Sequence, residues 1–349
     1  MGVGEYRVQP VFVIAEAGVN HNGDIDLALA LCDAAKAAGA DAVKFQSFRA
    51  IDLVVQGAPT AEYQSKQTGE YDQFVMLAKL ELNEEQHERI LEHCDHIGIE
   101  FFSTPFSLPA VDLLLRLGVR RLKISSGELT HRQLVEYAAA TQLPLLLSTG
   151  MATLEEIAEA LGWVRGVRGH LKDVTVLHCT SAYPAEDSSL NLRAMRQMHD
   201  VLGVPIGYSD HSLGIDAALA AVALGACVIE KHLTLDRGLP GPDHAASLDP
   251  EELLQMVQGI RRVESMLGDG IKLPRPEERD TARVARRSVV ALVDIPEGIP
   301  LGPQHLGCRR PGTGVAPRDL DALLGRRLRR AVPSGSTLQW SDVEPESKG

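Results

Sequence analysis

Two histidines in this chain are spaced like ligands of a metal ion. His211 follows a short apolar run that ends near Tyr208, and His232 follows a second run at residues 228–231, with an Ala-rich helix predicted between them. If both runs are neighbouring parallel strands, a right-handed crossover brings the two imidazoles side by side. Two imidazoles without cysteine favour a divalent ion with open positions, Mn²⁺ or Mg²⁺ rather than structural Zn²⁺. The alternative interpretation is a pair of hydrogen-bonded core or turn histidines.

Other polar residues also stand where apolar runs end. Lysines and hydroxyls that face one cavity can hold a phosphate and a carboxylate. Glu16 and Glu128 are candidate acid–base groups, because carboxyls in a partly dry cavity have raised pKa values. The alternative for each glutamate is an ion pair with Lys44 or Lys123, and for the serines a role as helix caps. The set comprises Glu16, Lys44, Gln46, Thr104, Lys123, Ser126, Glu128, Ser148, Ser181, Tyr183 and Ser209.

The elements that must position these residues alternate regularly. Short, continuously apolar runs indicate strands buried on both faces, and a helical pattern follows each one. Strands are expected at residues 11–15, 41–46, 100–103, 121–124, 145–148, 174–178, 205–208 and 228–231. Helices are expected at 24–38, 84–97, 109–117, 132–141, 154–164, 192–199, 215–224 and 250–266. Eight such units predict an α/β fold, the (β/α)₈ TIM barrel, with its site at the carboxyl ends of the strands. An open doubly wound sheet is disfavoured because no GxGxxG motif follows the first run.

The pattern divides the chain into domains. The barrel is predicted at residues 1–267, a linker at 268–287 and a small β-rich domain at 288–349. Strands of the small domain are expected at 289–293, 320–324, 328–332 and 338–340. So small a domain has a modest core, so we expect it to dock on another surface. Within the barrel, residues 47–83 are expected to form a long loop that could close over the site.

Composition narrows the class of protein. The formal net charge of −12 argues against a nucleic-acid binder or an anionic-membrane binder. The five cysteines are scattered and show no CxxC spacing, which is typical of a reduced, cytoplasmic protein. The first ten residues lack a signal-peptide core, and no apolar run is long enough to span a membrane. We therefore expect a soluble cytoplasmic protein.

Several motifs resemble the sialic acid synthase family, which condenses phosphoenolpyruvate with an N-acylated hexosamine. One is Lys123-Ile124-Ser125-Ser126-Gly127-Glu128. Residues 309–314 resemble the antifreeze-like (SAF) domain with which these enzymes end. The resemblance covers nearly the whole chain in order. Its other segments are residues 14–23, 43–46, 103–106, 147–151, 208–211, 230–232 and 241–244.

The resemblance implies a manganese-dependent enzyme that works as a domain-swapped homodimer, each antifreeze-like domain capping the other barrel. C3 of phosphoenolpyruvate attacks the open-chain aldehyde of the sugar, water adds at C2, and phosphate leaves. By motif, His211 and His232 resemble the metal ligands, and Glu16 and Glu128 the catalytic carboxylates. Sugar contacts are implied for Tyr183, Asp243, the partner subunit's Arg310 and, where some members have Asn, Ser181. Contacts with phosphoenolpyruvate and its surroundings are implied for Lys44, Gln46, Thr104, Lys123, Ser126, Ser148 and Ser209.

The resemblance leaves the identity of the acceptor sugar open. The first expectation is N-acetylmannosamine, giving N-acetylneuraminate. Residues 130–133 and 184–187 depart from the family pattern near the expected sugar site, which keeps a diacetamido-trideoxyhexose leading to legionaminate or pseudaminate as the alternative. A Schiff-base pyruvate aldolase would need a lone desolvated lysine and no metal. A non-catalytic carbohydrate-binding protein would show no metal dependence.

Overall fold

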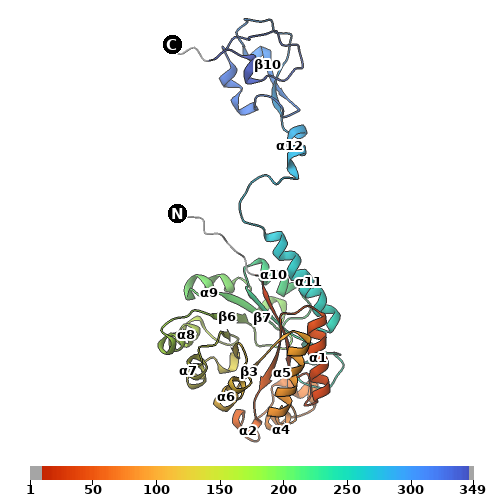
Figure 1. The fold of residues 1–349 in the computed structure, drawn as a ribbon, viewed down its shortest axis with the longest axis vertical. Coiled ribbons are helices and arrows are strands. Elements are labelled where there is room, and N and C mark those ends of the chain that lie inside the picture. Colours follow the sequence, from red (N-terminus) through yellow and green to blue (C-terminus); the bar gives the residue numbers. More distant parts are fainter. Residues whose placement is uncertain (1–9, 346–349) are drawn as a thin grey trace. The chain divides into compact units, whose positions relative to one another are not determined.

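The computed structural model describes residues 10–345. The chain divides into two compact units that meet between Asp269 and Gly270, and each is described by itself (Figure 1). No helix among the described residues is long and apolar enough to cross a membrane.

The first unit is an eight-stranded parallel barrel. Its sheet order is β3-β2-β1-β8-β7-β6-β5-β4, and the two end strands, β3 and β4, also lie beside each other, so the barrel is nearly closed (Figure 1). This confirms the predicted fold class. The strands are β1 Phe12–Gly18, β2 Ala42–Ser47, β3 Glu100–Pro105, β4 Leu122–Ile124, β5 Leu145–Ser148, β6 Val174–Cys179, β7 Ile206–Asp210 and β8 Val228–His232.

Helices surround the barrel and begin at recognisable caps. The side chains of Asn83, Thr153 and Asp249 each accept a backbone N–H of the first helical turn, and a Gln or Glu three residues later returns the bond. The apolar faces of the helices pack on the strands as one core. The helices are α1 Ile25–Ala37, α5 Glu84–Ile97, α6 Leu108–Arg116, α7 Arg132–Ala140, α8 Leu154–Arg168, α9 Ala194–Leu202, α10 Asp216–Ala223 and α11 Pro250–Leu267.

The pleat of the strands places polar residues directly above an apolar layer inside the barrel. Ile14, Ala42, Phe102, Leu146, Leu177 and Val228 form that layer. Because side chains alternate along a strand, the residue two positions later points to the same side. Those residues are Glu16, Lys44, Thr104, Ser148, Cys179 and Glu230.

Residues 47–83 are more ordered than expected. They contain α2 Ala50–Leu53, α3 Glu62–Thr68 and α4 Gln73–Ala78, so the prediction of a structureless loop was wrong. The carboxylate of Asp72 accepts the backbone N–H groups of Phe74 and Val75 and begins α4. The segment also packs through a small apolar cluster of its own. The polar composition of residues 47–83 gave no indication of these helices or of the apolar cluster.

The second unit is a small β domain. β9 Ser288–Ala291 and β10 Leu306–Arg309 pair antiparallel around an apolar cluster. The predicted linker contains α12 Glu278–Ala285, and the backbone N–H of Gly312 donates to the carbonyl of Arg283, so α12 belongs to this unit. The strand predicted at 320–324 is wrong, because the chain forms 3₁₀ turns at Pro317–Asp319 and Asp321–Leu323, which bury Leu323 instead. The predicted strands at 328–332 and 338–340 form only isolated bridges or turns.

Candidate active site

A cavity of about 480 Å³ opens at the carboxyl ends of the barrel strands. Such a position is where barrel enzymes place their chemistry. Most residues singled out from the sequence line this cavity. They are Glu16, Lys44, Gln46, Thr104, Lys123, Ser126, Ser148, Ser181, Tyr183, Ser209, His211, His232 and Asp243.

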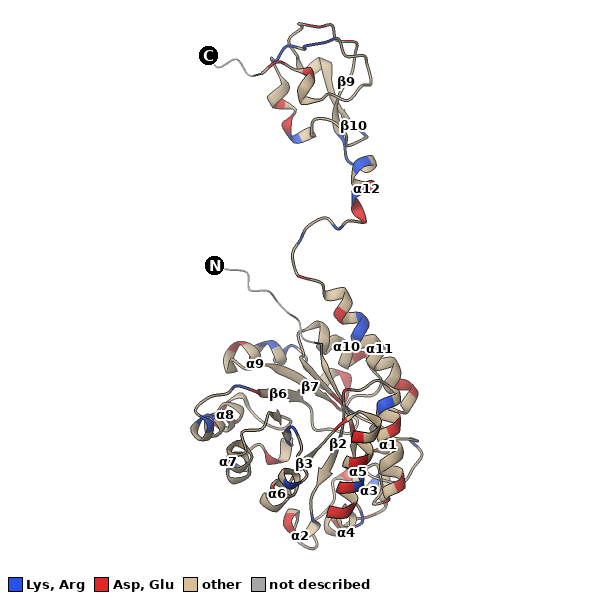
Figure 2. Ribbon diagram, viewed as in Figure 1, with Lys and Arg blue, Asp and Glu red and all other residues tan. Residues whose placement is uncertain are grey.

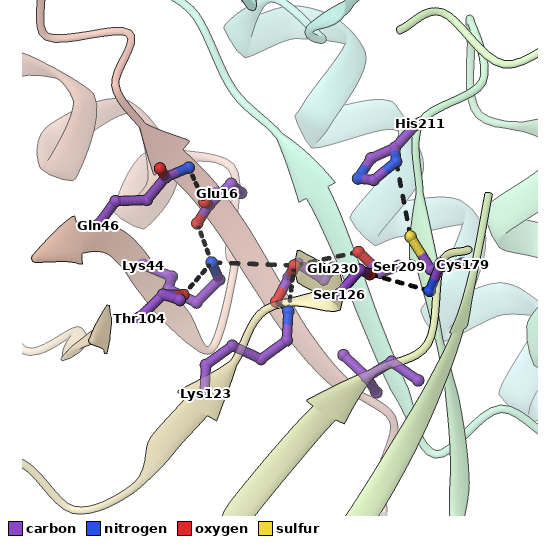
Figure 3. A network of polar contacts seen from close by, with 12 residues as sticks. Glu16, Lys44, Gln46, Thr104, Lys123, Ser126, Cys179, Ser209, His211 and Glu230 are labelled. Carbon is purple, nitrogen blue, oxygen red and sulfur yellow. Dashed lines mark hydrogen bonds and ion pairs between the residues drawn. The ribbon is translucent and has the colours of Figure 1, made fainter. Parts of the chain in front are cut away.

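Two lysines and two glutamates form a buried ionic network on the cavity floor (Figure 3). Lys44 Nζ lies 2.7 Å from Glu16 Oε2 and 3.9 Å from Glu230 Oε1. Lys123 Nζ lies 2.7 and 2.9 Å from the two oxygens of Glu230. All four side chains are buried. Each charge therefore has a partner, as a low-dielectric site requires.

Hydrogen bonds fix the edges of this network. Lys44 Nζ donates to Thr104 Oγ1 at 3.0 Å, and Gln46 Nε2 donates to Glu16 Oε1 at 3.3 Å. Ser209 Oγ donates to Glu230 Oε1 at 3.1 Å. Thr104, Gln46 and Ser209 thus hold the charged groups in place.

The two glutamates differ in protonation. Burial raises the pKa of Glu16 to about 7, although Lys44 acts against that shift. Burial would also raise the pKa of Glu230, but Lys123 and Lys44 outweigh it and hold that pKa at about 2. Pairs of carboxyls with separated pKa values divide into an acid–base group and a permanent charge. Glu16 fits the first role and Glu230 the second.

Unpaired serine hydroxyls line the same cavity as the lysines. Ser125 Oγ and Ser148 Oγ are buried and have no hydrogen-bond partner within residues 10–345. Ser126 Oγ accepts the backbone N–H of Gly150 at 2.9 Å. A Cβ at Gly150 would come within 2.1 Å of Ser181 Oγ and 3.0 Å of Ser126 Oγ, so a larger residue there would displace these hydroxyls. Buried donors left without partners, next to two lysines, suit the oxygens of a phosphate or carboxylate.

The two predicted metal ligands are close together. The ring centroids of His211 and His232 are 5.5 Å apart. His211 Nδ1 lies 2.9 Å from the carbonyl oxygen of Thr180, so this nitrogen carries a proton and Nε2 is left as the ligand atom. His232 Nδ1 is buried with no hydrogen-bond partner in the described chain. Burial and the neighbouring His211 hold the pKa of His232 well below its usual range.

These residues fit a divalent ion with open coordination positions. The acidic oxygen that approaches these imidazoles is Asp243 Oδ2, which lies 3.9 Å from His232 Nδ1. Among residues 10–345, no group of three or more His, Cys, Asp or Glu side chains is arranged around one point. Burial lowers the pKa of His211, but the Cys179 thiol and the Thr180 carbonyl raise it, and the net shift is upward. Metal binding to an imidazole displaces such a proton. The protein would supply two imidazoles and leave the other positions to water and substrate.

Aromatic rings stand over the imidazoles. The ring of Tyr183 lies 4.2 Å from that of His211, and the ring of Tyr63 on α3 stacks on Tyr183 at 5.2 Å. Asp243 lies on the loop between β8 and α11, and burial raises its pKa to about 6. The backbone carbonyl of Asp243 accepts a hydrogen bond from Ser247 Oγ at 2.7 Å. Stacked rings and a carboxyl in one cavity are groups that bind sugars.

Comparison with known proteins identifies the family. Residues 31–272 match the NeuB family, and residues 286–344 match the SAF domain. The chain belongs to the NeuB family. It is a phosphoenolpyruvate-dependent nonulosonate synthase with a C-terminal SAF domain, and the family is metal-dependent.

Named relatives of this NeuB-family enzyme span nearly its whole length. It is 47% identical to an N,N'-diacetyllegionaminic acid synthase of Legionella pneumophila over 95% of this chain and 94% of the relative. It is 43% identical to an N,N'-diacetyllegionaminic acid synthase of Campylobacter jejuni over 91% of this chain and 96% of the relative. The crystal structure of an N-acetylneuraminic acid synthetase from Leptospira borgpetersenii is 35% identical, with a TM-score of 0.69, covering 80% of this chain and 94% of that one.

Two predicted site residues of the NeuB-family enzyme lie elsewhere. Glu128 ends the 3₁₀ turn Ser126–Glu128, and its Oε2 lies 2.7 Å from His131 Nδ1. Glu128 is not among the residues that line the cavity. The alternative of an ion pair between Glu128 and Lys123 is wrong, because Lys123 pairs with Glu230. Arg310 is exposed at the end of β10 in the second unit.

The cavity lining also includes residues to which the sequence analysis gave no role, among them Glu230, Cys179, Tyr63 and Ser125. Cys179 Sγ lies 3.6 Å from His211 Nδ1 (Figure 3). A signal existed for Glu230, because it stands two residues before His232 on one strand and so points to the same side. Tyr63 had no such signal, since it reaches the cavity only through the fold of residues 47–83.

Proposed function

We propose that this enzyme condenses phosphoenolpyruvate with a 2,4-diacetamido-2,4,6-trideoxyhexose to give a legionaminate-type nonulosonate and phosphate. The observation that carries the chemistry is the single cavity that joins the lysine–glutamate network, the unpaired serine hydroxyls and the imidazole pair. The choice of acceptor is supported by the two relatives named as N,N'-diacetyllegionaminic acid synthases, at 47% and 43% identity. N-acetylmannosamine, the first expectation, has weaker support from the 35% identical synthetase.

The cations and hydroxyls of the floor would bind phosphoenolpyruvate. Lys44 and Lys123 face its phosphate and carboxylate, and Ser125, Ser126 and Ser148 donate to the oxygens. Glu230 stays ionised beside both lysines, and its charge opposes the burial that lowers the pKa of Lys123. Held in this way, C3 of the enol can be aimed at the acceptor carbon, which removes much of the entropic barrier.

His211 and His232 would hold the divalent ion, which when bound supplies a Lewis acid for the aldehyde oxygen of the acceptor. We infer Mn²⁺ because it accepts both imidazole and oxygen ligands, with Mg²⁺ as the second choice. Tyr183 and Asp243 flank the imidazoles and would orient the sugar. Tyr63 limits the access of water from the side of α3.

The bond changes follow from this arrangement. C3 of the enol bonds to the aldehyde carbon, whose oxygen takes up a proton from solvent, and C2 becomes electron-poor. Glu16 accepts a proton from the water that adds at C2, a role suited to a carboxyl with a pKa near 7, and later returns it to solvent. The resulting tetrahedral carbon then breaks its bond to the phosphate oxygen, and the proton of its new hydroxyl leaves with the phosphate, which gives a C2 ketone and inorganic phosphate.

The test is phosphate release by chelator-treated protein, with and without Mn²⁺, on a diacetamido-trideoxyhexose and on N-acetylmannosamine. We expect release that needs the metal and the diacetamido sugar together. Mn²⁺ binding followed by calorimetry should disappear in His211→Ala and His232→Ala but persist in His93→Ala, whose imidazole pairs with Asp33 on the surface. Release from N-acetylmannosamine alone would contradict the proposed acceptor. Unchanged Mn²⁺ binding in both variants would contradict the metal site.

We also propose a homodimer in which Arg310 of the partner subunit completes the sugar site. Residues 1–269 carry more acidic than basic residues, whereas residues 270–349 carry more basic than acidic ones (Figure 2). Opposite charge favours docking of the second unit on a barrel. Inactive Arg310→Ala and inactive His211→Ala protein, mixed to exchange subunits, should regain about one quarter of the wild-type activity. No regain after proven exchange would show that the site is complete within one chain.

A further inference from the structure

One wall of the cavity is apolar, in contrast to the charged floor. Met76 and Leu77 on α4 and the following Leu80 line it, together with Val19 after β1 and Phe106 at the end of β3. Val19, Met76 and Leu80 are each at most 6% exposed. With Phe48 they form an apolar cluster separate from the barrel core. We call Val19, Met76, Leu77, Leu80 and Phe106 the apolar wall.

The other sides of the cavity bind the reacting end of the acceptor, so the apolar wall is available to its far end. The reacting carbon must meet C3 of phosphoenolpyruvate near the lysine floor and the two imidazoles. Asp243 and Tyr183 lie beside those imidazoles and provide polar contacts for the carbons next to the aldehyde. Because residues of α4 line the same cavity, they are available to the far end of a six-carbon chain that starts at the imidazoles.

The side chains of the wall discriminate between two kinds of substituent. Met, Leu, Val and Phe offer a methyl group favourable burial, but they offer a hydroxyl no hydrogen-bond partner, so a buried hydroxyl there loses its bonds to water. Gln64 and Gln73 also line the cavity, and their amides can bond to an acetamido group. The combination suits a sugar that carries both an acylamino group and a methyl group at this end.

We propose that the apolar wall is the subsite for the C6 methyl group of the acceptor and selects a 6-deoxy sugar over its 6-hydroxy counterpart. This rests on the proposed function and adds to it the substituent that is recognised and the residues that recognise it. The competing explanation is that these side chains serve only to pack α4 on the barrel. That explanation predicts no effect of the wall on the choice between two acceptors.

The experiment compares two acceptors that differ by one oxygen, 2,4-diacetamido-2,4,6-trideoxymannose and 2,4-diacetamido-2,4-dideoxymannose. The readout is kcat/KM for phosphate release. For the wild type we expect at least a tenfold preference for the 6-deoxy sugar, the size typical of one methyl group in an apolar pocket, about 10- to 200-fold.

Variants of α4 then locate the selectivity. Leu77→Gln and Met76→Gln place an amide in the wall at nearly constant volume, so we expect the preference to fall about tenfold, with kcat/KM rising for the 6-hydroxy sugar. Val75→Gln is the control, because Val75 lies on the same helix, is 39% exposed and does not line the cavity. Its preference should equal that of the wild type. Leu77 is only half-buried, so Leu77→Gln keeps the test available if Met76→Gln does not fold.

Two failures can be told apart. If the wild type uses both diacetamido sugars equally well, or if Leu77→Gln turns over both with the wild-type preference, the wall is not the methyl subsite although the proposed function stands. If phosphate is released with N-acetylmannosamine and with neither diacetamido sugar, the proposed function and the methyl subsite are both overturned, because N-acetylmannosamine carries a hydroxyl group on C6.

Discussion

Lys123 Nζ lies 2.7 Å from one carboxylate oxygen of Glu230 and 2.9 Å from the other, at the buried floor of the barrel. Lys44 approaches the same carboxylate at 3.9 Å, so Glu230 is shared by two lysines. Glu16 is the second carboxyl of the group, and its pKa of about 7 means that it can be neutral. With Glu16 protonated, the floor carries one net positive charge, which favours an anionic substrate.

Glu230→Gln should destabilise the protein as well as stop turnover. The substitution leaves two buried lysines with less compensation, and breaking such a pair from one side costs about 3 to 5 kcal/mol. We expect a lower free energy of unfolding in urea. Glu62→Gln is the control, because its pair with Lys66 is exposed and should contribute nothing measurable. Equal urea midpoints for both variants would contradict the structural role of Glu230.

Glu16→Gln should separate binding from turnover. The amide mimics the protonated carboxyl, so the KM for phosphoenolpyruvate should stay the same or fall, while kcat falls about 100- to 10,000-fold with the loss of the base. Glu128→Gln should keep kcat within a few fold, because Glu128 lies outside the cavity lining. Steady-state phosphate release measures both. A larger loss in Glu128→Gln than in Glu16→Gln would reverse the assignment.

Tyr63→Ala should weaken the sugar site alone. Tyr63 stacks on Tyr183, whose ring packs at a tilt against His211, so its loss should raise the KM for the acceptor about tenfold, as expected for one aromatic pair. The KM for phosphoenolpyruvate should hardly change. Tyr71→Ala, in the same segment but 77% exposed, is the control. A parallel rise in both KM values would point to general loosening of the segment.

Stability should depend on pH through His21. Its ring is fully buried, and burial with neighbouring His87 lowers its pKa to about 4. In the unfolded chain the pKa of His21 is near 6.5, so between about pH 6.5 and 4 the unfolded chain binds a proton there that the folded protein does not bind. Stability therefore falls as the pH drops through this window. The slope in that window is about 1.4 kcal/mol per pH unit for this group. Urea unfolding at several pH values should show a shallower slope in His21→Asn, and an unchanged slope would refute the assignment.

The sequence by itself determined the barrel and most of its site. Alternation of apolar runs with helical patterns specifies parallel strands, and all their carboxyl ends meet at one mouth. Polar residues in or near those ends, such as Lys44, His211 and His232, can therefore be grouped from their positions in the chain. The acidic barrel and the basic C-terminal segment also follow from composition alone.

Only the tertiary structure decided which side chains point inward. Strand alternation puts Glu230 on the side of His232, but its partners Lys123 and Lys44 come from other strands and meet it only once the barrel closes. Glu128 turns outward because residues 126–128 form a 3₁₀ turn instead of extending the strand. Met76 reaches the cavity because α4 packs on Val19 and Phe48, and Tyr63 does so because its ring stacks on that of Tyr183. These contacts join residues far apart in the chain, and local pattern does not encode contacts of that kind.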